Sequence, residues 1–360
     1  MCDAKDTLCR PAGRIVPLEE AVGMLLAHDV TEIRRGEFKG RAYRKGHIVS
    51  EADIERLRDL GKNNLYVLAV AEGEMHEDDA AAALADALMG RGVSVLGTPC
   101  EGKLNIVAET DGILKVDKEA LLSVNMLGDV MCATLHDNTF VKRGAAVAGT
   151  RAIPLVVKKS VIGEAVAIAE AVRLAGYGVV EVVEIRKPRA GIVVTGDEVY
   201  HGRVEDAFST VISEKIRALG GGVVGVRYAP DDEAVIADRL RELLDSGADL
   251  LVVTGGMSVD PDDVTRFAVR RLGAEDITYG SASLPGAMVL TAYIKKGTDT
   301  VPIIGIPACG MYHRTTVFDL LVPRMLAGEL IGRRELAELG HGGLCLGCKV
   351  CGYPVCPFGK

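Results

Sequence analysis

The feature that most constrains the fold is an alternation of apolar strands and helices from residue 191 onward. Strands are predicted at GIVVTG, VVGVRY and DLLVVTGG, and the last of these is almost continuously apolar. Helices are predicted between them, from Ser209 to Leu219 with Ser209 as the cap, and from Asp231 to Leu244. Apolar strands separated by helices are typical of a parallel sheet covered on both faces. We therefore predict a parallel-sheet, helix-flanked α/β domain over residues 187–330.

Two of these predicted strands end in the same kind of sequence. IVV runs into TGDE at residues 195–198, and LVV runs into TGGMS at residues 254–258. Parallel sheets bind ligands at the carboxyl ends of their strands, and glycines there let backbone N–H groups approach an anion closely. The paired endings predict an anion-binding edge of the sheet.

Acidic residues follow the second of these endings. Asp260 is expected at the N-cap of a helix, Pro261 at its first position, and Asp262 and Asp263 behind it. Such a helix start is a phosphate cradle, but acids beside a phosphate repel it unless a divalent cation lies between them. Mg²⁺ suits a few carboxylates and phosphate oxygens. The alternative is that these acids only cap the helix.

The run TGDEVYHG, the two acids of APDDE and the run DLLVVTGGMSVDPDDVT resemble a known family. It is the molybdopterin-binding domain shared by molybdopterin molybdotransferases and molybdopterin adenylyltransferases. Further on, LPGAM resembles the family's Pro-Gly strand entry, and GIPACG stands where the family has a Gly-Leu-Pro-Gly-Asn-Pro turn. The resemblance covers roughly 140 residues and is weaker over the first 72, in AVGMLLAHDVT and RKGHIVSEADI.

The resemblance implies a site and a reaction. The family either adenylylates molybdopterin or inserts molybdate into adenylyl-molybdopterin with release of AMP. Asp197 and Asp263 would be the catalytic acids, holding Mg²⁺ or positioning molybdate. The residues expected to bind the pterin and its phosphate are Thr195, Gly196, Glu198, Thr254, Gly255, Gly256, Ser258, Asp262, Pro285, Gly286, Gly305 and Pro307.

The sequence departs from the family in three places. Ala308 and Cys309 replace the usual Gly and Asn, and Asp260 stands where Gly is common. Cys309 is either a thiolate for molybdenum or, as we favour, a small buried apolar residue. The family's C-terminal β-barrel is replaced by about thirty residues rich in Gly and Cys. We therefore keep a second hypothesis beside the enzyme, namely a non-catalytic carrier, chaperone or sensor of molybdopterin.

The short C-terminal tail, residues 331–360, carries the spacing C-x2-C-x2-C-x4-C, formed by Cys345, Cys348, Cys351 and Cys356. Four thiolates at this spacing suit zinc or an iron–sulfur cluster, and His341 could replace one of them. With a cluster, the tail would serve redox sensing or docking to a molybdenum enzyme. The alternative is a mobile tail with free thiols.

The rest of the chain is predicted as two smaller modules, an α+β module over residues 1–72 and a β-rich module with helices over 73–186. The first contains a basic run, formed by Arg34, Arg35, Lys39, Arg41, Arg44 and Lys45. This run either faces an anionic ligand across a subunit interface, as the resemblance implies for a homo-oligomer, or is a solvated face.

Composition excludes several classes of protein. A net charge of -8, no Trp and 4% aromatic residues argue against nucleic-acid binding. No run approaches the ~18 apolar residues that span a bilayer, and the N-terminus lacks the apolar run of a secretory signal. We therefore expect a cytoplasmic protein that binds no membrane.

Overall fold

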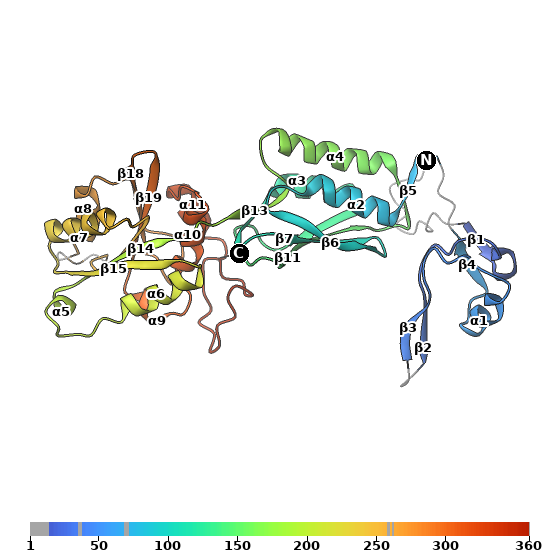
Figure 1. Cartoon of the computed structure of the whole chain (residues 1–360), viewed down its shortest axis with the longest axis horizontal. Helices are drawn as coiled ribbons and strands as arrows, with labels where there is room; N and C mark the ends of the chain where they lie inside the picture. Colours follow the sequence, from blue (N-terminus) through green and yellow to red (C-terminus); the bar gives the residue numbers. More distant parts are fainter. Residues whose placement is uncertain (1–13, 35–37, 68–71, 258–259, 261–262, 360) are drawn as a thin grey trace. The chain divides into compact units, whose positions relative to one another are not determined.

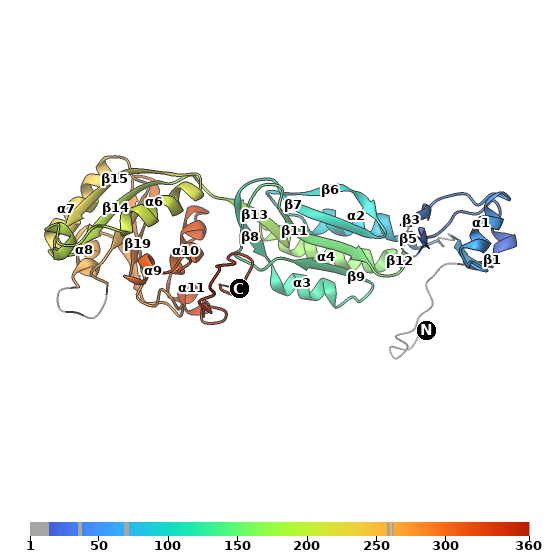
Figure 2. The same ribbon diagram turned by 90° about the horizontal axis from the view of Figure 1, so that it is seen from below.

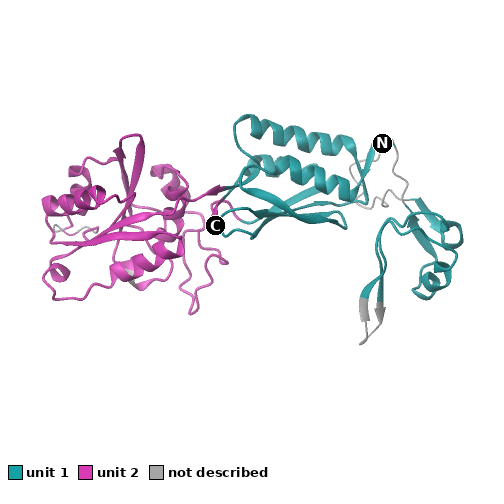
Figure 3. Ribbon diagram, viewed as in Figure 1, with its two compact units in different colours: residues 1–110, 114–135, 141–182 teal, residues 111–113, 136–140, 183–360 magenta. Residues whose placement is uncertain are grey.

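The computed structural model of the chain describes residues 14–34, 38–67, 72–257, 260 and 263–359. The chain divides into two compact units (Figure 3). Unit 1 comprises residues 1–110, 114–135 and 141–182, and unit 2 comprises residues 111–113, 136–140 and 183–360. The modules predicted over residues 1–72 and 73–186 thus fall almost wholly in unit 1. The predicted α/β domain and the tail fall in unit 2.

The N-terminal part of unit 1 has a small core of its own. Two antiparallel strand pairs and two short helices surround a buried cluster that includes Leu18, Leu26, Leu57 and Leu65. The elements are β1 (Arg14–Pro17), the 3-10 helix η1 (Leu18–Ala21), β2 (Val30–Arg34), β3 (Phe38–Tyr43), α1 (Asp53–Asp59) and β4 (Asn64–Val67).

The remainder of unit 1 is a four-stranded antiparallel sheet covered by helices. Its strand order is β6-β7-β11-β9, and α2 and α4 pack side by side over one face (Figures 1 and 2). The elements of this part of the chain, of which β8, β10 and β13 are divided between the two units, are β5 (Glu74–His76), α2 (Glu77–Leu88), β6 (Val93–Cys100), β7 (Lys103–Ala108), β8 (Gly112–Val116), α3 (Lys118–Asn125), β9 (Val130–Thr134), β10 (Phe140–Val141), β11 (Ala146–Ala152), β12 (Val156–Lys158), α4 (Lys159–Leu174) and β13 (Val180–Glu184).

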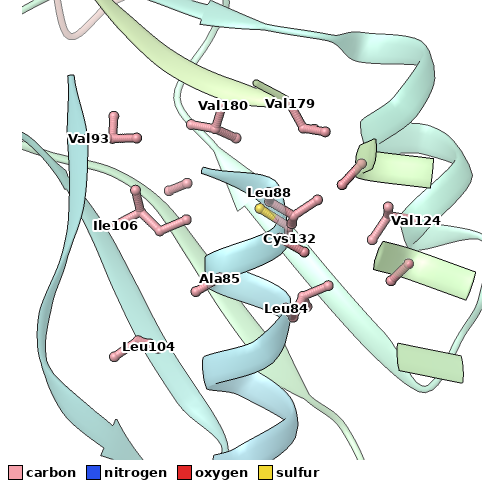
Figure 4. Close-up of a cluster of buried hydrophobic side chains, with 14 of the residues drawn as sticks. Leu84, Ala85, Leu88, Val93, Leu104, Ile106, Val124, Cys132, Val179 and Val180 are labelled. Carbon is pink, nitrogen blue, oxygen red and sulfur yellow. The ribbon is translucent and has the colours of Figure 1, made fainter. Parts of the chain in front are cut away.

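Helix α2 forms the centre of this core. Its Leu84 and Leu88 are fully buried and lie in one cluster with Leu104 and Ile106 of β7 (Figure 4). The helix begins with Glu77, Asp78 and Asp79, where negative charge suits the helix dipole. The alanine side chains of α2 are small, so α4 can pack closely against this helix.

Unit 2 is built on a six-stranded sheet in the order β15-β14-β16-β19-β18-β17. The first four strands are parallel, as predicted, whereas β18 and β17 extend the sheet antiparallel. The antiparallel edge arises because a tight turn at Gly297 joins β18 to β19, and such a turn reverses the chain. The strands are β14 (Arg189–Thr195), β15 (Gly222–Ala229), β16 (Leu250–Thr254), β17 (Glu275–Tyr279), β18 (Leu290–Lys296) and β19 (Asp299–Ile306).

Helices cover both faces of this sheet, which explains its apolar strands. Ile192 and Val194 pack with α6 and α10, whereas Val193 between them packs with α7 and α8 (Figure 1). The predicted helix-flanked α/β fold is therefore confirmed. The helices are α5 (Asp197–Tyr200), α6 (Phe208–Ala218), α7 (Glu233–Asp245), α8 (Thr265–Arg271), α9 (Cys309–Tyr312), α10 (Val317–Leu326) and α11 (Arg333–Glu338).

Two predicted helix starts are wrong. Ser209 is not a cap, because helix α6 begins at Phe208 and the Ser209 N–H donates to the carboxylate of Asp206 at 3.0 Å. Asp260 is not an N-cap either, since α8 begins only at Thr265. The Asp260 N–H instead donates to the Asp263 carboxylate at 3.0 Å. Among the described residues, no helix is both long and apolar enough to cross a membrane.

Candidate functional site

The carboxyl ends of four parallel strands meet at one edge of the unit 2 sheet. Thr195 of β14 lies opposite Ala229 of β15. Thr254 of β16 lies opposite Val194 of β14 on one side and Ile306 of β19 on the other. The segments that follow these strands therefore emerge side by side. This is the edge at which open α/β sheets bind their ligands.

Two threonines join the strand ends beneath this edge. The Thr195 hydroxyl donates to the Thr254 carbonyl at 3.0 Å, and the Thr265 hydroxyl donates to the Gly255 carbonyl at 3.0 Å. Thr195 and Thr254 are buried, so both support the edge and neither forms its surface. The Thr254 hydroxyl is itself buried with no hydrogen-bond partner among the described residues.

Gly255 and Gly256 turn the chain at the end of β16, with φ of +89° and +57°. A Cβ on Gly255 would lie 2.6 Å from the Thr195 carbonyl oxygen, and one on Gly256 would lie 2.4 Å from the Thr265 hydroxyl. Both positions therefore need glycine for two reasons, the left-handed backbone and the close approach. The turn leaves their backbone partly exposed at the sheet edge.

A cavity of about 630 Å³ opens beside this turn. Its size lies in the range of small-molecule sites. Six of the residues predicted from the sequence line it, together with others that the sequence did not indicate. The lining residues are Gly255, Gly256, Met257, Asp263, Leu284, Pro285, Gly286, Ala287, Met288, Pro307, Ala308, Cys309, His313, Leu344 and Cys345.

Two glycines give the cavity its shape. Gly286 has φ of +123°, and a Cβ there would lie 2.4 Å from Cγ1 of Val317 on α10. Gly305 of β19 does not line the cavity but lies behind Met257, whose Cε would be 2.2 Å from a Cβ on Gly305. Gly305 thus adjoins the cavity only through the Met257 side chain.

A group of carboxylates lies next to this turn on the β14 side. The Asp197 N–H donates to the Asp231 carboxylate at 3.2 Å, and the Asp231 N–H donates to the Asp197 carboxylate at 3.4 Å. Burial raises the pKa of Asp231, and repulsion from Asp197, Glu198 and Asp263 raises it further. The four acids thus form one negatively charged group after β14, β15 and β16. We call it the acid cluster.

The acid cluster has oxygen donors of the type that Mg²⁺ prefers. Within the described ranges, however, no three His, Cys, Asp or Glu side chains are arranged to hold one metal ion. Asp231 is one of the two acids of APDDE, a run that carries the family resemblance but in which no residue was assigned a role. Its position two residues after the end of β15 was the available signal.

The structure brings together only part of the predicted site. Asp197, Glu198 and the buried Thr195, Gly196 and Thr254 lie at the strand ends, outside the lining of the cavity. Ser258 and Asp262 lie outside the described residues.

Arg266 is a side chain of this region that was not predicted from the sequence as a site residue. Its guanidinium lies 5.6 Å from the centre of the Tyr279 ring, and its buried Nε has no partner among the described residues.

Three further side chains near the strand ends have reactive groups. Cys309 lines the cavity and is half-buried, and burial raises the pKa of its thiol, which favours the neutral form. His313 lines the cavity as well, whereas His201 packs against the Tyr200 ring at 5.3 Å. Neither histidine was predicted to be catalytic.

The basic run of unit 1 is partly neutralised. Arg41 pairs with Asp29 at 3.0 Å, and Lys45 pairs with Glu77 and Asp78 at 2.9 and 2.8 Å. The side chains of Arg34 and Lys39, and the whole of Arg35, lie outside the described residues. Arg41 and Lys45 thus have acidic partners within the chain, and Lys45 is largely buried, so neither is a free cation awaiting an anionic ligand.

The four tail cysteines are free thiols in unit 2. They line a second cavity of about 480 Å³, together with His313, Arg314 and Thr315. His341 is exposed and does not line this cavity. The Thr315 hydroxyl lies 3.2 Å from Cys351 Sγ. This contact, an N–H from Tyr353 and the charge of Arg314 lower the pKa of Cys351.

The fold and the cavity define the class of this domain. It is a helix-flanked α/β domain whose ligand cavity lies beside a Gly-Gly turn at the carboxyl ends of its parallel strands. Residues 191–327 match the model of a probable molybdopterin binding domain. Unit 2 thus carries a molybdopterin-binding domain of the kind found in molybdenum cofactor biosynthesis. Residues 15–69 match a domain of unknown function (DUF8806).

Individual relatives match parts of the chain. A CinA-like protein of Mycobacterium avium is 39% identical over 89 residues, which are 25% of this chain and 20% of that protein. The match thus spans about a fifth of the length of the curated relatives. The tungsten cofactor synthesizing protein MoaB from Pyrococcus furiosus is 21% identical with a TM-score of 0.32, covering 38% of this chain and 90% of its own. A molybdenum cofactor biosynthesis protein from Pyrococcus furiosus is 14% identical with a TM-score of 0.25, covering 90% of this chain and 64% of its own.

Proposed function

We propose that the protein binds adenylyl-molybdopterin and inserts molybdate into it with release of AMP. The observation that carries the proposal is the cavity of about 630 Å³ between the Gly255–Gly256 turn and the Pro285–Gly286 segment, beside the acid cluster. A phosphorylated pterin needs an apolar slot, backbone amides for its phosphates and a place for a counter-ion. These three elements adjoin one another here.

Different walls of the cavity would contact different parts of the ligand. Met257, Pro285, Met288 and Pro307 present apolar surface to a flat ring system. The turn at Gly255 presents backbone without a side chain, so that phosphate oxygens can approach it closely. The ring would thus contact the apolar wall and the phosphates would contact the turn.

Asp197 and Asp263 would hold Mg²⁺ together with the phosphate oxygens of the ligand, with Asp231 beside them, because three side chains of the described residues alone do not form the site. A bound cation would neutralise charge between these carboxylates and the phosphate oxygens. The raised pKa of Asp231 supports this assignment, because crowded acids favour a cation or a proton. The carboxylate of Asp263 lines the cavity and is fixed by the Asp260 N–H.

The chain's own residues act mainly by positioning. Gly255 and Gly256 orient the phosphates, and Asp263 sets the position of the charged end of the ligand. Water would add across the phosphoanhydride bond as it breaks, so that AMP leaves, and the two dithiolene sulfurs would displace one oxygen of molybdate as water while the apolar wall retains the pterin. Such catalysis rests on fixed charges and dipoles more than on covalent participation.

A second candidate is a molybdopterin carrier without catalysis. It is favoured by Ala308 and Cys309, which line the cavity where the family has Gly and Asn. A neutral thiol and a methyl group at this position supply apolar contact in place of the amide of Asn. Such a site binds the pterin but offers fewer polar groups to the reacting end.

The deciding measurement is AMP release by the full chain from adenylyl-molybdopterin, with Mg²⁺ and molybdate, under anaerobic conditions. We expect release that depends on molybdate. Asp263→Asn should slow it about 10²-fold, the cost typical of removing one group that stabilises charge. The dissociation constant for the pterin should change little.

The control is Asp238→Asn, which removes an exposed acid of the same domain on α7. It should leave both AMP release and pterin binding unchanged. Tight pterin binding without release by the native chain would establish the carrier instead. Absence of both binding and release would exclude both functions.

A further inference from the structure

The cysteine tail is docked on unit 2 at both of its ends. Leu344 forms a parallel bridge to Leu284, and the Cys345 N–H donates to the Leu284 carbonyl at 2.8 Å. At the other end Phe358 is buried, and the Gly359 N–H donates to the Gly342 carbonyl at 2.9 Å. Between these points the Tyr353 hydroxyl donates to the Asp319 carbonyl at 3.2 Å. The tail is therefore a looped lobe with a defined path.

This lobe has almost no hydrophobic core to hold its shape. Leu346, Val350 and Val355 are 71%, 83% and 89% exposed, and residues 345–359 contain neither helix nor strand. So short a segment gains too little from apolar burial to order itself, and small folds of this kind usually rely on disulfides or a metal. The cysteines of this lobe are not joined by disulfides.

All four tail cysteines line the same cavity of about 480 Å³. Arg314 and Lys349 line it as well, and their positive charge offsets that of several thiolates gathered in one place. The thiols converge on one space without yet surrounding a single ion position. The backbone between them forms neither helix nor strand, so no regular element fixes the spacing of the thiols.

We propose that Cys345, Cys348, Cys351 and Cys356 form a metal site that holds the tail lobe together, occupied by a thiophilic metal as zinc or as an iron–sulfur cluster. Each thiol that binds loses its proton to solvent and donates an electron pair to the metal, with no change in the oxidation state of sulfur. The metal takes the place of the missing hydrophobic core. The site is separate from the acid cluster, which offers oxygen ligands.

The metal site adjoins the cavity of about 630 Å³ beside the Gly255–Gly256 turn. Cys345, Leu344 and His313 line both cavities, so the loop that carries the first thiolate is also a wall of the other cavity. Closing the loop on a metal fixes this wall. The metal site itself needs no pterin, and its test is independent of the proposed function.

The test uses the full chain purified without oxygen. Its zinc, iron and acid-labile sulfide are measured, and the chain stripped by a chelator is then titrated with zinc alone or with ferrous iron and sulfide. We expect one zinc ion, or the iron and sulfide of one cluster with its visible absorption. Either result supports the site, and the arms tell which metal it holds. No metal in either arm, or two disulfides in the tail, overturns it.

Variants locate the site. The double variant Cys348→Ser, Cys351→Ser should weaken metal binding at least about 100-fold, because two thiolate ligands are lost. Loss of a group that only supports a ligand already weakens metal binding about 10–100-fold. Cys100→Ser removes an exposed thiol of unit 1 and should bind metal as the native chain does. Unchanged binding by the double variant contradicts the proposal.

A second measurement needs no variant. Zinc should protect the tail thiols of the native chain from alkylation and slow amide exchange over residues 345–356, and a chelator should reverse both effects. Zinc that binds without protecting these thiols lies elsewhere on the chain, and the assignment is then wrong.

Discussion

The carboxylate of Asp53 ties the start of helix α1 to the preceding loop. It accepts hydrogen bonds from His47 Nε2 at 2.8 Å, the Ser50 backbone N–H at 2.9 Å and the Ser50 hydroxyl at 2.7 Å. Burial alone would raise the pKa of Asp53, but these hydrogen bonds and the nearby imidazole hold it well below its usual value. The ionised form is therefore strongly favoured in the folded chain.

This pKa predicts a pH-dependent stability of the N-terminal core. A carboxylate with a depressed pKa stabilises the fold above its unfolded-state pKa of about 3.9, and this contribution is lost as the pH falls below that value. Asp53→Asn should reduce the free energy of opening of α1 by about 1 kcal/mol at neutral pH. The difference from the native chain should shrink progressively below about pH 4. Amide hydrogen exchange of α1 in the full chain measures it.

The matched control is Glu55→Gln, which removes an exposed acid from the same helical turn. It should cost only a few tenths of a kcal/mol, since it loses an interaction with the helix dipole alone. If Asp53→Asn shifts protection by the same amount at every pH, the hydrogen-bonded carboxylate is not the source of the stability.

At the scale of elements, the turn after β16 shows why glycine is needed at a particular position. Gly255 must adopt a positive φ and also lie against the end of β14. Gly297, in the turn between β18 and β19, shares the positive φ of +65°, but a Cβ at this position would have no atom within 4 Å. A substitution at Gly297 therefore introduces backbone strain alone, whereas one at Gly255 introduces backbone strain and a steric clash.

We expect Gly297→Ala to lower the thermal midpoint of unit 2 by about 2–4 °C, because it costs about 1 kcal/mol for the left-handed backbone. Gly255→Ala should lower the midpoint by at least about twice as much, since it adds a clash with the Thr195 carbonyl. Calorimetry of the full chain measures both. Equal shifts would mean that the close approach to β14 is not limiting.

Gly305 and Met257 form a second pair that can be tested together. A Cβ on Gly305 would lie 2.2 Å from Met257 Cε, the flexible end of a side chain that lines the cavity beside the Gly255–Gly256 turn. Gly305→Ala should cost about 1–3 kcal/mol of stability through overpacking. In a Met257→Ala background this cost should fall by about 1 kcal/mol, as expected for residues in direct contact. Additive costs in the double variant would show that Met257 does not transmit the change.

At the scale of the whole molecule, the two units have separate buried clusters. Leu84 of α2 belongs to the core of unit 1, whereas Val252 and Ile304 belong to the core of unit 2. A chain of this kind need not unfold in one step. Damage to one core should therefore leave the other intact.

Leu84→Ala should reduce the stability of unit 1 by about 2–5 kcal/mol, because it opens a cavity at a fully buried site. Hydrogen exchange should accelerate in α2 and β7 while β14, β16 and β19 keep their protection. Leu122→Ala, at a 56% exposed position of α3, should change unit 1 by less than about 0.5 kcal/mol. Loss of protection in both units after Leu84→Ala would show that they unfold as one.

Much of unit 2 could be predicted from the sequence, because the relevant signals are local. The unbroken apolar runs at IVV and LLVV reveal strands buried on both faces, and the Thr-Gly endings mark where these strands stop. Burial of both strand faces requires helices on both sides, so the layer order follows as well. The tail spacing likewise indicates a common site for its cysteines, since neighbours in sequence cannot lie far apart in space.

Contacts between distant segments were decided only by the tertiary structure. Asp231 joins Asp197 because β15 pairs with β14, and the run APDDE, although it resembles the family, assigns no role to either of its acids. Thr195 and Thr254 carry the same local signature as exposed site residues, yet pairing of their strands buries them. Cys345 lines the cavity beside the Gly255–Gly256 turn because the tail docks on Leu284, some sixty residues earlier in the chain. Local patterns determine which elements form, whereas strand pairing and packing determine which side chains meet.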